Sequence, residues 1–461
     1  MNAVWKNQRV ITLRVLVASL VVLAIASSAQ AGPRGQWTRL PGTVINFAEP
    51  GLGRTGDGVL HVVYTRRNGT KEDLIHLEVS PAGKVGPDAV ALGGWSAMSH
   101  PDLLRMPDGS LRAFFGGIRS TNVGETNKRL STATAPASGT PWTLRPGDVV
   151  QAPSAYATGV TGAGLAKDGT PISTWSGSPG LGFHYGIDAS APDGKIPQSG
   201  CCLYTPEIAV DSANGQAWVG FHSNESAGPG LYVNAIGPGG PQGGRRLAQG
   251  SVVGKSSIYP GNRASLTGRV GAGGVYLFFG QGYPTFKTLA LWKVDTAKPQ
   301  LVLKVDRNEH ANIAAAPEGR LWLMWEQNGT IFAARTNRAA SRLGAVNAIR
   351  PPSGASIYRL NGEGSAGPLD LIANMQAAGG QALWHQQVWP KLSLTGSRSG
   401  TRIVFRVTDA GDAVAGATVK AVGETLKTNG AGRATLAQAP AGRVKATASK
   451  AAYSPATATV R

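Results

Sequence analysis

A tight turn followed by a short apolar strand recurs along this chain, and it constrains the fold more than any other feature. Asp-Gly, Asn-Gly and Gly-Gly pairs supply the positive φ angles that two-residue β-hairpins require. The turns lie at Asp57-Gly58, Asp108-Gly109, Asp168-Gly169, Asn214-Gly215, Gly273-Gly274, Glu318-Gly319 and Gly379-Gly380. Because they recur about every 54 residues, we infer a repeated supersecondary unit.

Each unit has room for four strands. An apolar strand precedes most turns, as in TPEIAV, ANIAAA and LDLIANM, and a further strand follows in segments such as LIHLEV and TIFAAR. Four-stranded units repeated around an axis form a β-propeller, whose radial closure leaves few exposed sheet edges. We therefore predict an all-β fold with a seven-bladed propeller over residues 32–389. Six blades and an open sandwich are the alternatives.

Two similar segments predict how the ring closes. WTRLPG at 37–42 resembles WTLRPG at 142–147, and the second copy lies where an outer fourth strand belongs. The N-terminal copy is therefore expected to provide the outer strand of the last blade.

The N-terminus, residues 1–31, reads as a signal peptide. Lys6, Arg9 and Arg14 precede a short apolar run, and Ala29-Gln30-Ala31 is a small-x-small cleavage site. No later stretch has the length and apolar character of a transmembrane segment. We expect a bacterial protein that is secreted, either periplasmic or extracellular.

The charge balance narrows the possible partners. Without the three basic residues of the leader, the formal net charge falls from +19 to +16. Such a charge favours acidic glycans, nucleic acid or an anionic surface. The longest basic clusters are only Arg66-Arg67 and Arg245-Arg246, with no stripe of interleaved aromatics. We therefore expect a monomer whose partner is a glycan or cell-surface polysaccharide, and no nucleic-acid partner.

Polar residues gather in the segments that enter the inner strands, which converge on one face of a propeller. Convergent polar groups there form the default ligand site. Four are candidates for catalysis: Glu207, Arg263, His310 and Tyr259. Five more are candidates for ligand binding: His100, Tyr156, Tyr204, Asn262 and Glu309. The alternative for His100 and His310 is a backbone hydrogen bond between blades, and for Glu207 a structural ion pair with Arg263.

The only two cysteines, Cys201 and Cys202, are adjacent and lie in the segment entering the fourth blade. Export favours oxidation, and no other cysteine is present to pair with them. We predict a vicinal disulfide; reduced thiols and an intermolecular bridge are the alternatives. No metal-ligand spacing such as His-x-His is present, so no metal site and no cofactor are expected.

The repeated units and the polar face resemble the sialidase-like and BNR-repeat propellers of secreted glycan-active proteins, from Gly35 to about Pro390. The Asp-box of that family, Ser-x-Asp-x-Gly-x-Thr-Trp, is not intact; SANGQAW at 212–218 is a degenerate form. The resemblance implies a Tyr–Glu nucleophile pair, for which Tyr259 and Glu207 are the candidates, and a carboxylate-binding arginine, for which Arg263 is the candidate.

Three classes of function remain. The first is carbohydrate recognition without catalysis. The second is sialidase-like glycoside hydrolysis, which needs two carboxyl groups about 5 to 9.5 Å apart. The third is a polysaccharide lyase that cleaves an acidic glycan with a cation for the uronate and a base such as His310. Fold alone does not choose among them.

Residues 390–461 form a second region with period-2 strands and Gly-rich turns. It holds eleven Lys and Arg against three Asp and Glu. The segments VTDAGDAVAGATV, TNGAGRATL and KAAYSPATATV resemble carboxypeptidase-regulatory-like and bacterial immunoglobulin-like modules. That resemblance implies a small Ig-like β-sandwich that acts as a spacer or an adhesive module.

Overall fold

The computed structural model describes residues 35–461 except for 45–47, 120–128, 146–160, 177–182, 188–189, 196–202, 224–227, 238–239, 252–263, 282–285 and 307. For residues 176, 183–187, 190–195, 203–205 and 308–309 only the backbone is described. Among the described residues, no helix has the length and apolar character needed to cross a membrane.

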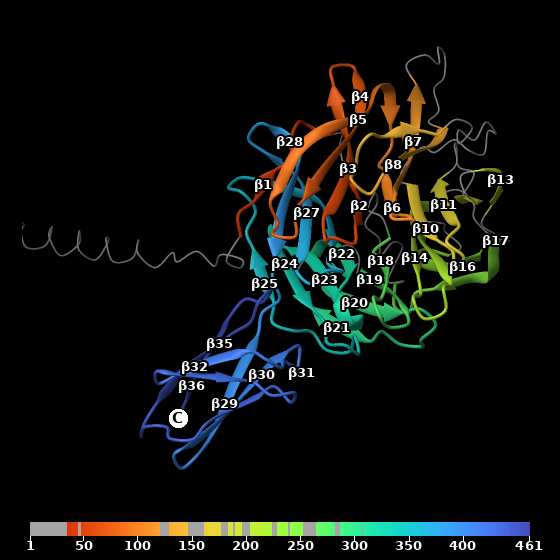
Figure 1. Cartoon of the computed structure of the whole chain (residues 1–461). Helices are drawn as coiled ribbons and strands as arrows, with labels where there is room; N and C mark the ends of the chain where they lie inside the picture. Colours follow the sequence, from red (N-terminus) through yellow and green to blue (C-terminus); the bar gives the residue numbers. More distant parts are fainter. Residues whose placement is uncertain are drawn as a thin grey trace, which may run out of the picture.

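The residues before 389 form antiparallel sheets whose strands follow one another from the inside outwards (Figure 1). In order, these are β2 (Gly51–Arg54), β3 (Leu60–Asn68), β4 (Lys71–Val79) and β5 (Val85–Met98); β6 (Asp102–Arg105), β7 (Leu111–Arg119), β8 (Arg129–Ala135) and β9 (Thr143–Leu144); β10 (Thr161–Leu165), β11 (Pro171–Ser176), β12 (Phe183–Ile187) and β13 (Ser190–Lys195); β14 (Leu203–Val210), β15 (Ala217–Ser223), β16 (Gly230–Gly237) and β17 (Gly240–Leu247); β18 (Leu266–Gly268), β19 (Val275–Gln281), β20 (Thr288–Lys293) and β21 (Leu301–Lys304); β22 (Asn308–Ala315), β23 (Leu321–Gln327), β24 (Thr330–Arg335) and β25 (Asn347–Ile349); and β26 (Ser356–Glu363), β27 (Leu369–Ala377), β28 (Gly380–Val388) and β1 (Thr38–Arg39). The long strand β5 pairs with both β4 and β7 and joins the first two groups into one sheet. A 3-10 turn, η2 (Pro317–Gly319), connects β22 and β23.

The first strand of each group, which we call the inner strand, contacts the inner strands of its neighbours. The contacts run from β2 through β6, β10, β14, β18 and β22 to β26, and β26 contacts β2 again. The fold is therefore all-β, and this cyclic arrangement is consistent with a β-propeller.

The hairpins after the inner strands depend on glycine, but their loops are longer than the predicted two residues. In the hairpin after β6, the Met106 amide donates to the Ser110 carbonyl at 2.8 Å, which leaves a three-residue loop. Gly109 takes φ +88°, the left-handed position that ends such a loop. The Ser110 amide donates to Asp108 Oδ1 at 2.9 Å. The turns after β2 and β10 are built in the same way.

The seventh predicted turn was assigned to the wrong hairpin. Gly379-Gly380 joins β27 to β28, and LDLIANM is a second strand, not an inner one. The inner strand of this sheet is β26, which returns through 364–368 with Gly367 at φ +124°. Both turns are rich in glycine and follow apolar segments, so local pattern alone does not distinguish them.

The N-terminal segment completes the last sheet, as the similarity of the two Trp-Thr segments predicts. Thr38 pairs with His385 and Arg39 with Trp384, and the Leu40 amide donates to the Leu383 carbonyl at 2.8 Å. The other copy forms β9, which pairs with β8 as an outer strand. Leu40 is 1% exposed and packs in a core shared by the first and last sheets. This short segment therefore contributes to joining the two ends of the ring.

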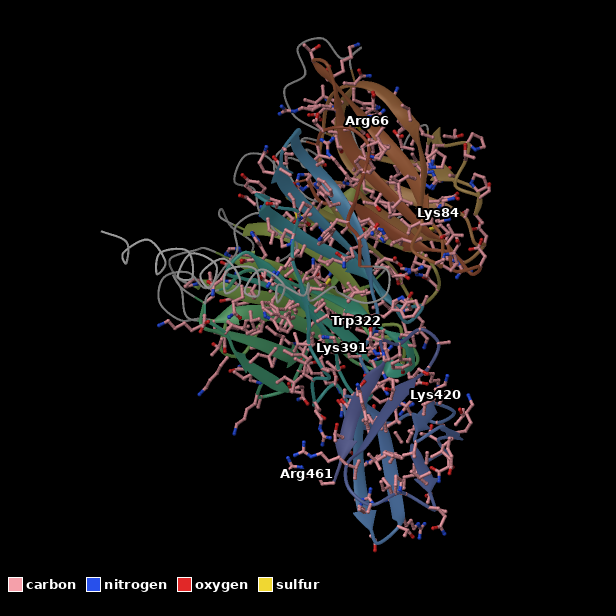
Figure 2. The ribbon with its side chains drawn as sticks, turned by 90° about the vertical axis from the view of Figure 1, so that its left-hand side faces the viewer. Arg66, Lys84, Trp322, Lys391, Lys420 and Arg461 are labelled. Atoms are coloured by element: carbon pink, nitrogen blue, oxygen red, sulfur yellow. The ribbon has the colours of Figure 1, made fainter. Side chains whose placement is uncertain are left out.

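Residues 393–460 form two facing sheets around one hydrophobic core (Figure 1). The first holds β29 (Ser393–Ser399), β30 (Arg402–Asp409), β31 (Asp412–Ala413) and β34 (Arg433–Leu436), and the second β33 (Glu424–Lys427), β32 (Thr418–Ala421), β35 (Val444–Ser449) and β36 (Ala456–Val460). Figure 2 shows Lys391 where this C-terminal region joins the larger one, with Lys420 and Arg461 beyond it.

A buried ionic cluster connects the two regions. Asp409 of β30, which is 1% exposed, accepts hydrogen bonds from Arg335 of β24. Arg320 lies 3.4 Å from the same carboxylate, and Arg335 also donates to the Tyr453 hydroxyl at 2.8 Å. Removing one partner of a buried charge pair is costly because the other charge stays buried without compensation.

We expect Leu40→Ala to lower the free energy of unfolding by about 2–5 kcal/mol, because it leaves a cavity in the core that holds the two ends of the ring together. The matched control is Val302→Ala, since Val302 is 56% exposed and should change stability by less than about 0.5 kcal/mol. Chemical denaturation followed by tryptophan fluorescence measures both. Equal stability of the two variants would contradict the closing role of this segment.

We expect Asp409→Ala to destabilise the protein by about 3–5 kcal/mol, because the buried Arg335 guanidinium loses its counter-charge and Arg320 loses one of its acidic partners. Asp412→Ala, at a carboxylate whose side chain is 22% exposed, is the control and should cost less. Limited proteolysis should cut the Asp409→Ala variant between the two regions first. Resistance equal to that of the native protein would show that the cluster does not hold the regions together.

Candidate functional site

A cavity of about 330 Å³ lies along the axis of the ring. We call it the central cavity. Inner strands and the residues just before them line it: Pro50, Leu52, Asp102, Glu207–Val210, Ala264, Leu266–Gly268, Asn312–Ala315 and Asn361–Gly364. Residues from six of the inner strands thus meet in one space.

A layer of polar side chains ties neighbouring inner strands together beside this cavity. Asp102 Oδ2 accepts from the Ala163 amide of the next inner strand at 2.6 Å. Ser265 donates to the Ala311 carbonyl at 2.8 Å, and the Asn312 amide group donates to the Leu360 carbonyl. Asp102, Ser265 and Asn312 each stand three positions before the last residue of their inner strand. The layer therefore has a structural function as well as lining the cavity.

Glycines allow the inner strands to approach closely at the same level. A Cβ atom added at Gly51 would lie 2.8 Å from backbone atoms of Asp102 and Leu103. One added at Gly162 would lie 2.8 Å from the Pro206 carbonyl oxygen. Real Cβ atoms do not approach backbone this closely, so a side chain at either position would force the strands apart.

The end of the cavity beside the hairpins is held by a buried charge network. Arg54, the last residue of β2, bonds Glu363 at the end of β26 and Asp370 of β27, the latter at 2.6 Å. His385 Nε2 lies 2.9 Å from Asp370 Oδ1. Burial lowers the pKa of Arg54, but the neighbouring carboxylates outweigh it and leave that pKa above its ordinary value. Glu363 therefore lines the cavity while it is paired with Arg54.

The residues just before the cavity lining include a second buried ion pair. Arg359 Nε of β26 lies 3.5 Å from Glu49 Oε1, and both residues are almost fully buried. Burial lowers the pKa of Arg359, and the Glu49 charge opposes that shift. His310 lies close by, since the Arg359 charge contributes to lowering its pKa. An anion-binding role for Arg359 would compete with this ion pair.

His310 has the environment of a neutral imidazole. Its Nε2 lies 3.1 Å from the Ile357 carbonyl oxygen, which only accepts, so Nε2 carries the proton. Burial, assisted by the Arg359 charge, lowers the pKa of His310 to about 4. A base with that pKa is far from the optimum for general base catalysis near neutral pH. The contact matches the alternative of a backbone bond between neighbouring units.

The structure describes only part of the predicted site. Glu207 is partly buried and lines the central cavity, whereas His310 and His100 are described but are not among the lining residues. For Tyr204 and Glu309 only the backbone is described, in β14 and β22. The remaining candidates lie outside the described residues: Arg263, Tyr259, Tyr156, Asn262, Cys201 and Cys202.

Polar lining residues that sequence reasoning missed include Asp102, Asn361 and Glu363. The signal for Asp102 was its position six residues before a turn, the same position that Asn312 holds before its own turn. Sequence reasoning also missed a cluster whose ligand atoms all lie within 4.8 Å of one another: His61, His76 and Glu78. No other group of this kind occurs in the part of the chain that the structure describes.

We expect protein stability to fall as the pH drops from about 6.5 towards 4, partly because of His310. The unfolded chain takes up a proton near pH 6.5, whereas the folded protein does so only near pH 4. Stability from the neutral side chain is thus complete above pH 6.5 and lost on acidification, by up to about 3 kcal/mol. In urea unfolding at pH 7.5 and 5.0, His310→Gln, which keeps a donor, should weaken this dependence. An unchanged pH dependence would contradict the assignment.

Comparison with known proteins gives likenesses that cover much of the chain at low identity. No protein-family model matches. A Hadza microbial sialidase, Hz136, is 12% identical with a TM-score of 0.46, covering 75% of this chain and 66% of its own. The polysaccharide lyase Uly1 is 10% identical with a TM-score of 0.45, covering 78% and 98%. A puromycin-hydrolyzing peptidase of Mycobacterium tuberculosis is 13% identical with a TM-score of 0.44, covering 81% and 61%.

One curated protein shows local similarity. The human retinitis pigmentosa 1-like 1 protein is 42% identical over 60 residues, which are 12% of this chain and 2% of that protein. The chain thus spans a very small part of this relative. At these identities and TM-scores, none of the likenesses carries an argument about function.

Proposed function

We propose that this protein is an exported, carbohydrate-recognising β-propeller of seven blades with a C-terminal Ig-like module, and that its central cavity binds a neutral sugar unit. The cycle of inner strand contacts from β2 to β26 and back supports the blade count. Residues 1–31 would be the signal peptide, residues 32–389 the propeller and residues 390–461 a spacer or adhesive β-sandwich. The observation that carries the function is the polar lining of the central cavity.

The lining offers the groups that sugar hydroxyls need. Carboxylates accept hydrogen bonds, and side-chain amides both donate and accept. Asp102, Glu207 and Glu363 supply carboxylates, while Asn312 and Asn361 supply amides. Apolar surface from Ile208, Leu266 and Ile313 lies beside them, and the volume is that of a small ligand pocket. Hydroxyl groups of a neutral sugar would match this combination.

The charge of the lining favours a neutral sugar over an acidic one. Among the described lining residues there are three acids and no Lys, Arg or His. A uronate or sialic acid carboxylate would be repelled there. Elimination at an acidic glycan also needs a cation, and its sequence-based candidate, Arg263, lies outside the described residues. Lyase activity is therefore the less supported alternative.

Glycoside hydrolysis is the second candidate, because several carboxyl groups share the cavity. Asp102 is engaged by two backbone amides, and Glu363 is paired with Arg54. Glu207 is partly buried on the inner strand β14. Among the described residues, Glu207 is the one candidate acid from the sequence that lines the cavity, so it is the acid tested for that role.

We expect Glu207→Gln to weaken binding of a neutral oligosaccharide by about 10- to 100-fold, because a charge-assisted hydrogen bond to a hydroxyl becomes a neutral one. A panel of neutral and acidic oligosaccharides, measured by calorimetry, identifies the ligand class. The control is Glu424→Gln in the exposed β33 of the C-terminal region. Equal affinity of Glu207→Gln and native protein, or binding of acidic glycans alone, would sink the proposal.

The same samples separate recognition from cleavage. New reducing ends that disappear in Glu207→Gln would establish hydrolysis, and added ultraviolet absorbance would establish elimination. Binding without either signal would establish a recognition protein. The vicinal disulfide of Cys201 and Cys202 remains a prediction, which mass spectrometry without reductant would test: two free thiols would refute it.

A further inference from the structure

We propose that His61, His76 and Glu78 form a binding site for a divalent transition-metal ion of the zinc class, on the hairpin of β3 and β4 and outside the lining of the central cavity. The site is independent of the proposed sugar binding. Two imidazoles and one carboxylate are a common protein ligand set for zinc with one position left for water.

The hairpin of β3 and β4 brings the three residues together. His61 lies directly opposite Glu78, and His76 lies opposite Val63, two places further along the same pair of strands. Since side chains alternate between the faces of a strand, all three share one face. His61 Nδ1 lies 2.9 Å from His76 Nε2 and 3.8 Å from Glu78 Oε1.

The distances of 2.9 Å and 3.8 Å between these ligand atoms lie on either side of the distance between two ligand atoms in a tetrahedral zinc site. Zinc–nitrogen bonds of about 2.0–2.1 Å place two ligand atoms about 3.3–3.4 Å apart. A small adjustment of the two rings, which are stacked with 5.2 Å between centroids, would reach that spacing. His61 and His76 are 1% and 5% exposed, whereas the Glu78 side chain is 45% exposed. The site is therefore enclosed on the imidazole side and open to an entering ion on the carboxylate side.

A hydrogen-bond chain directs the lone pair of His61 toward the site. Thr55 Oγ1 has one proton, and its neighbours Asp57 Oδ1, at 2.7 Å, and the Val59 carbonyl, at 3.1 Å, can only accept it. Thr55 Oγ1 therefore accepts from His61 Nε2, 3.2 Å away. In the neutral ring this leaves Nδ1 without a proton, the form in which histidine binds metals. Such outer contacts typically orient metal-binding histidines.

A glycine keeps the space over the two nitrogens clear. Gly139, in the segment between β8 and β9, takes φ +76°. A Cβ atom there would lie 2.8 Å from His76 Nε2 and 2.9 Å from His61 Nδ1. Trp142 of the same segment packs against His76 with 5.6 Å between ring centroids. An ion bound here would thus also lie against the segment between β8 and β9.

Spacing along the chain predicted no metal site, and this proposal replaces that expectation. His61 and His76 are 15 residues apart and belong to no short metal-binding motif. The sequence signal for this site was the Asn68-Gly69 turn. A hairpin that turns there pairs residue 61 with residue 78.

The test uses the full chain without a polyhistidine tag, stripped with a chelator and then dialysed against Zn²⁺. Elemental analysis should find one zinc per chain, and Co²⁺ should give the intense visible bands of a tetrahedral site. Glu78→Gln, at an exposed side chain, should weaken zinc binding by about 100-fold, and Thr55→Val by about 10-fold or more. Glu424→Gln is the control and should bind as the native protein does.

Zinc should also raise the melting temperature of the native protein and not that of Glu78→Gln, because only the folded native site binds the ion. No zinc retained by the native protein would overturn the proposal. So would equal zinc affinity of Glu78→Gln and native protein, or cobalt spectra that are octahedral in both. Sugar binding should be the same with and without zinc, which separates this test from that of the central cavity.

Discussion

The close approach of the inner strands around the axis is the constraint on which the rest of the structure depends. Where Gly51 and Gly162 stand, a side chain would collide with the backbone of the next inner strand. Asp102 and Asn312 instead use polar side chains to bond that backbone. The strands of each group then follow one another outwards, and the ends of the ring are joined by β1 on β28 and by the Arg54 ion pairs with Glu363 and Asp370.

This constraint also shapes what the central cavity can do. The polar residues that tie the inner strands are among those that line it, so a side chain with a structural bond also faces a prospective ligand. Such residues are held rigidly, which favours recognition because little ordering is lost on binding. Glu363 is likewise held by Arg54. The cavity is better suited to a small neutral ligand than to a large or anionic one.

Much of the fold could be predicted because turns are local. The glycine after Asp57, Asp108 and Asp168 supplies a positive φ wherever the chain folds back. The closing strand was predictable because WTRLPG at 37–42 resembles WTLRPG at 142–147, which the repeat had already assigned to an outer strand. Assignment failed at Gly379-Gly380, since two glycine-rich turns flank the apolar strand β27 and local pattern cannot say which is inner. The lining of the central cavity was harder to predict, because its residues come from segments far apart in the sequence.

The sequence by itself determined the class of the fold, the repeat and the segment that closes it, because these depend on turn chemistry and on alternation within a few residues. Tertiary structure decided which side chains meet. Arg54 bonds Glu363 across 309 residues, and Asp409 is buried between arginines 74 and 89 residues away. It also placed His61 opposite Glu78. Such contacts follow from ring closure and strand register, and short-range sequence pattern carries no record of ring closure.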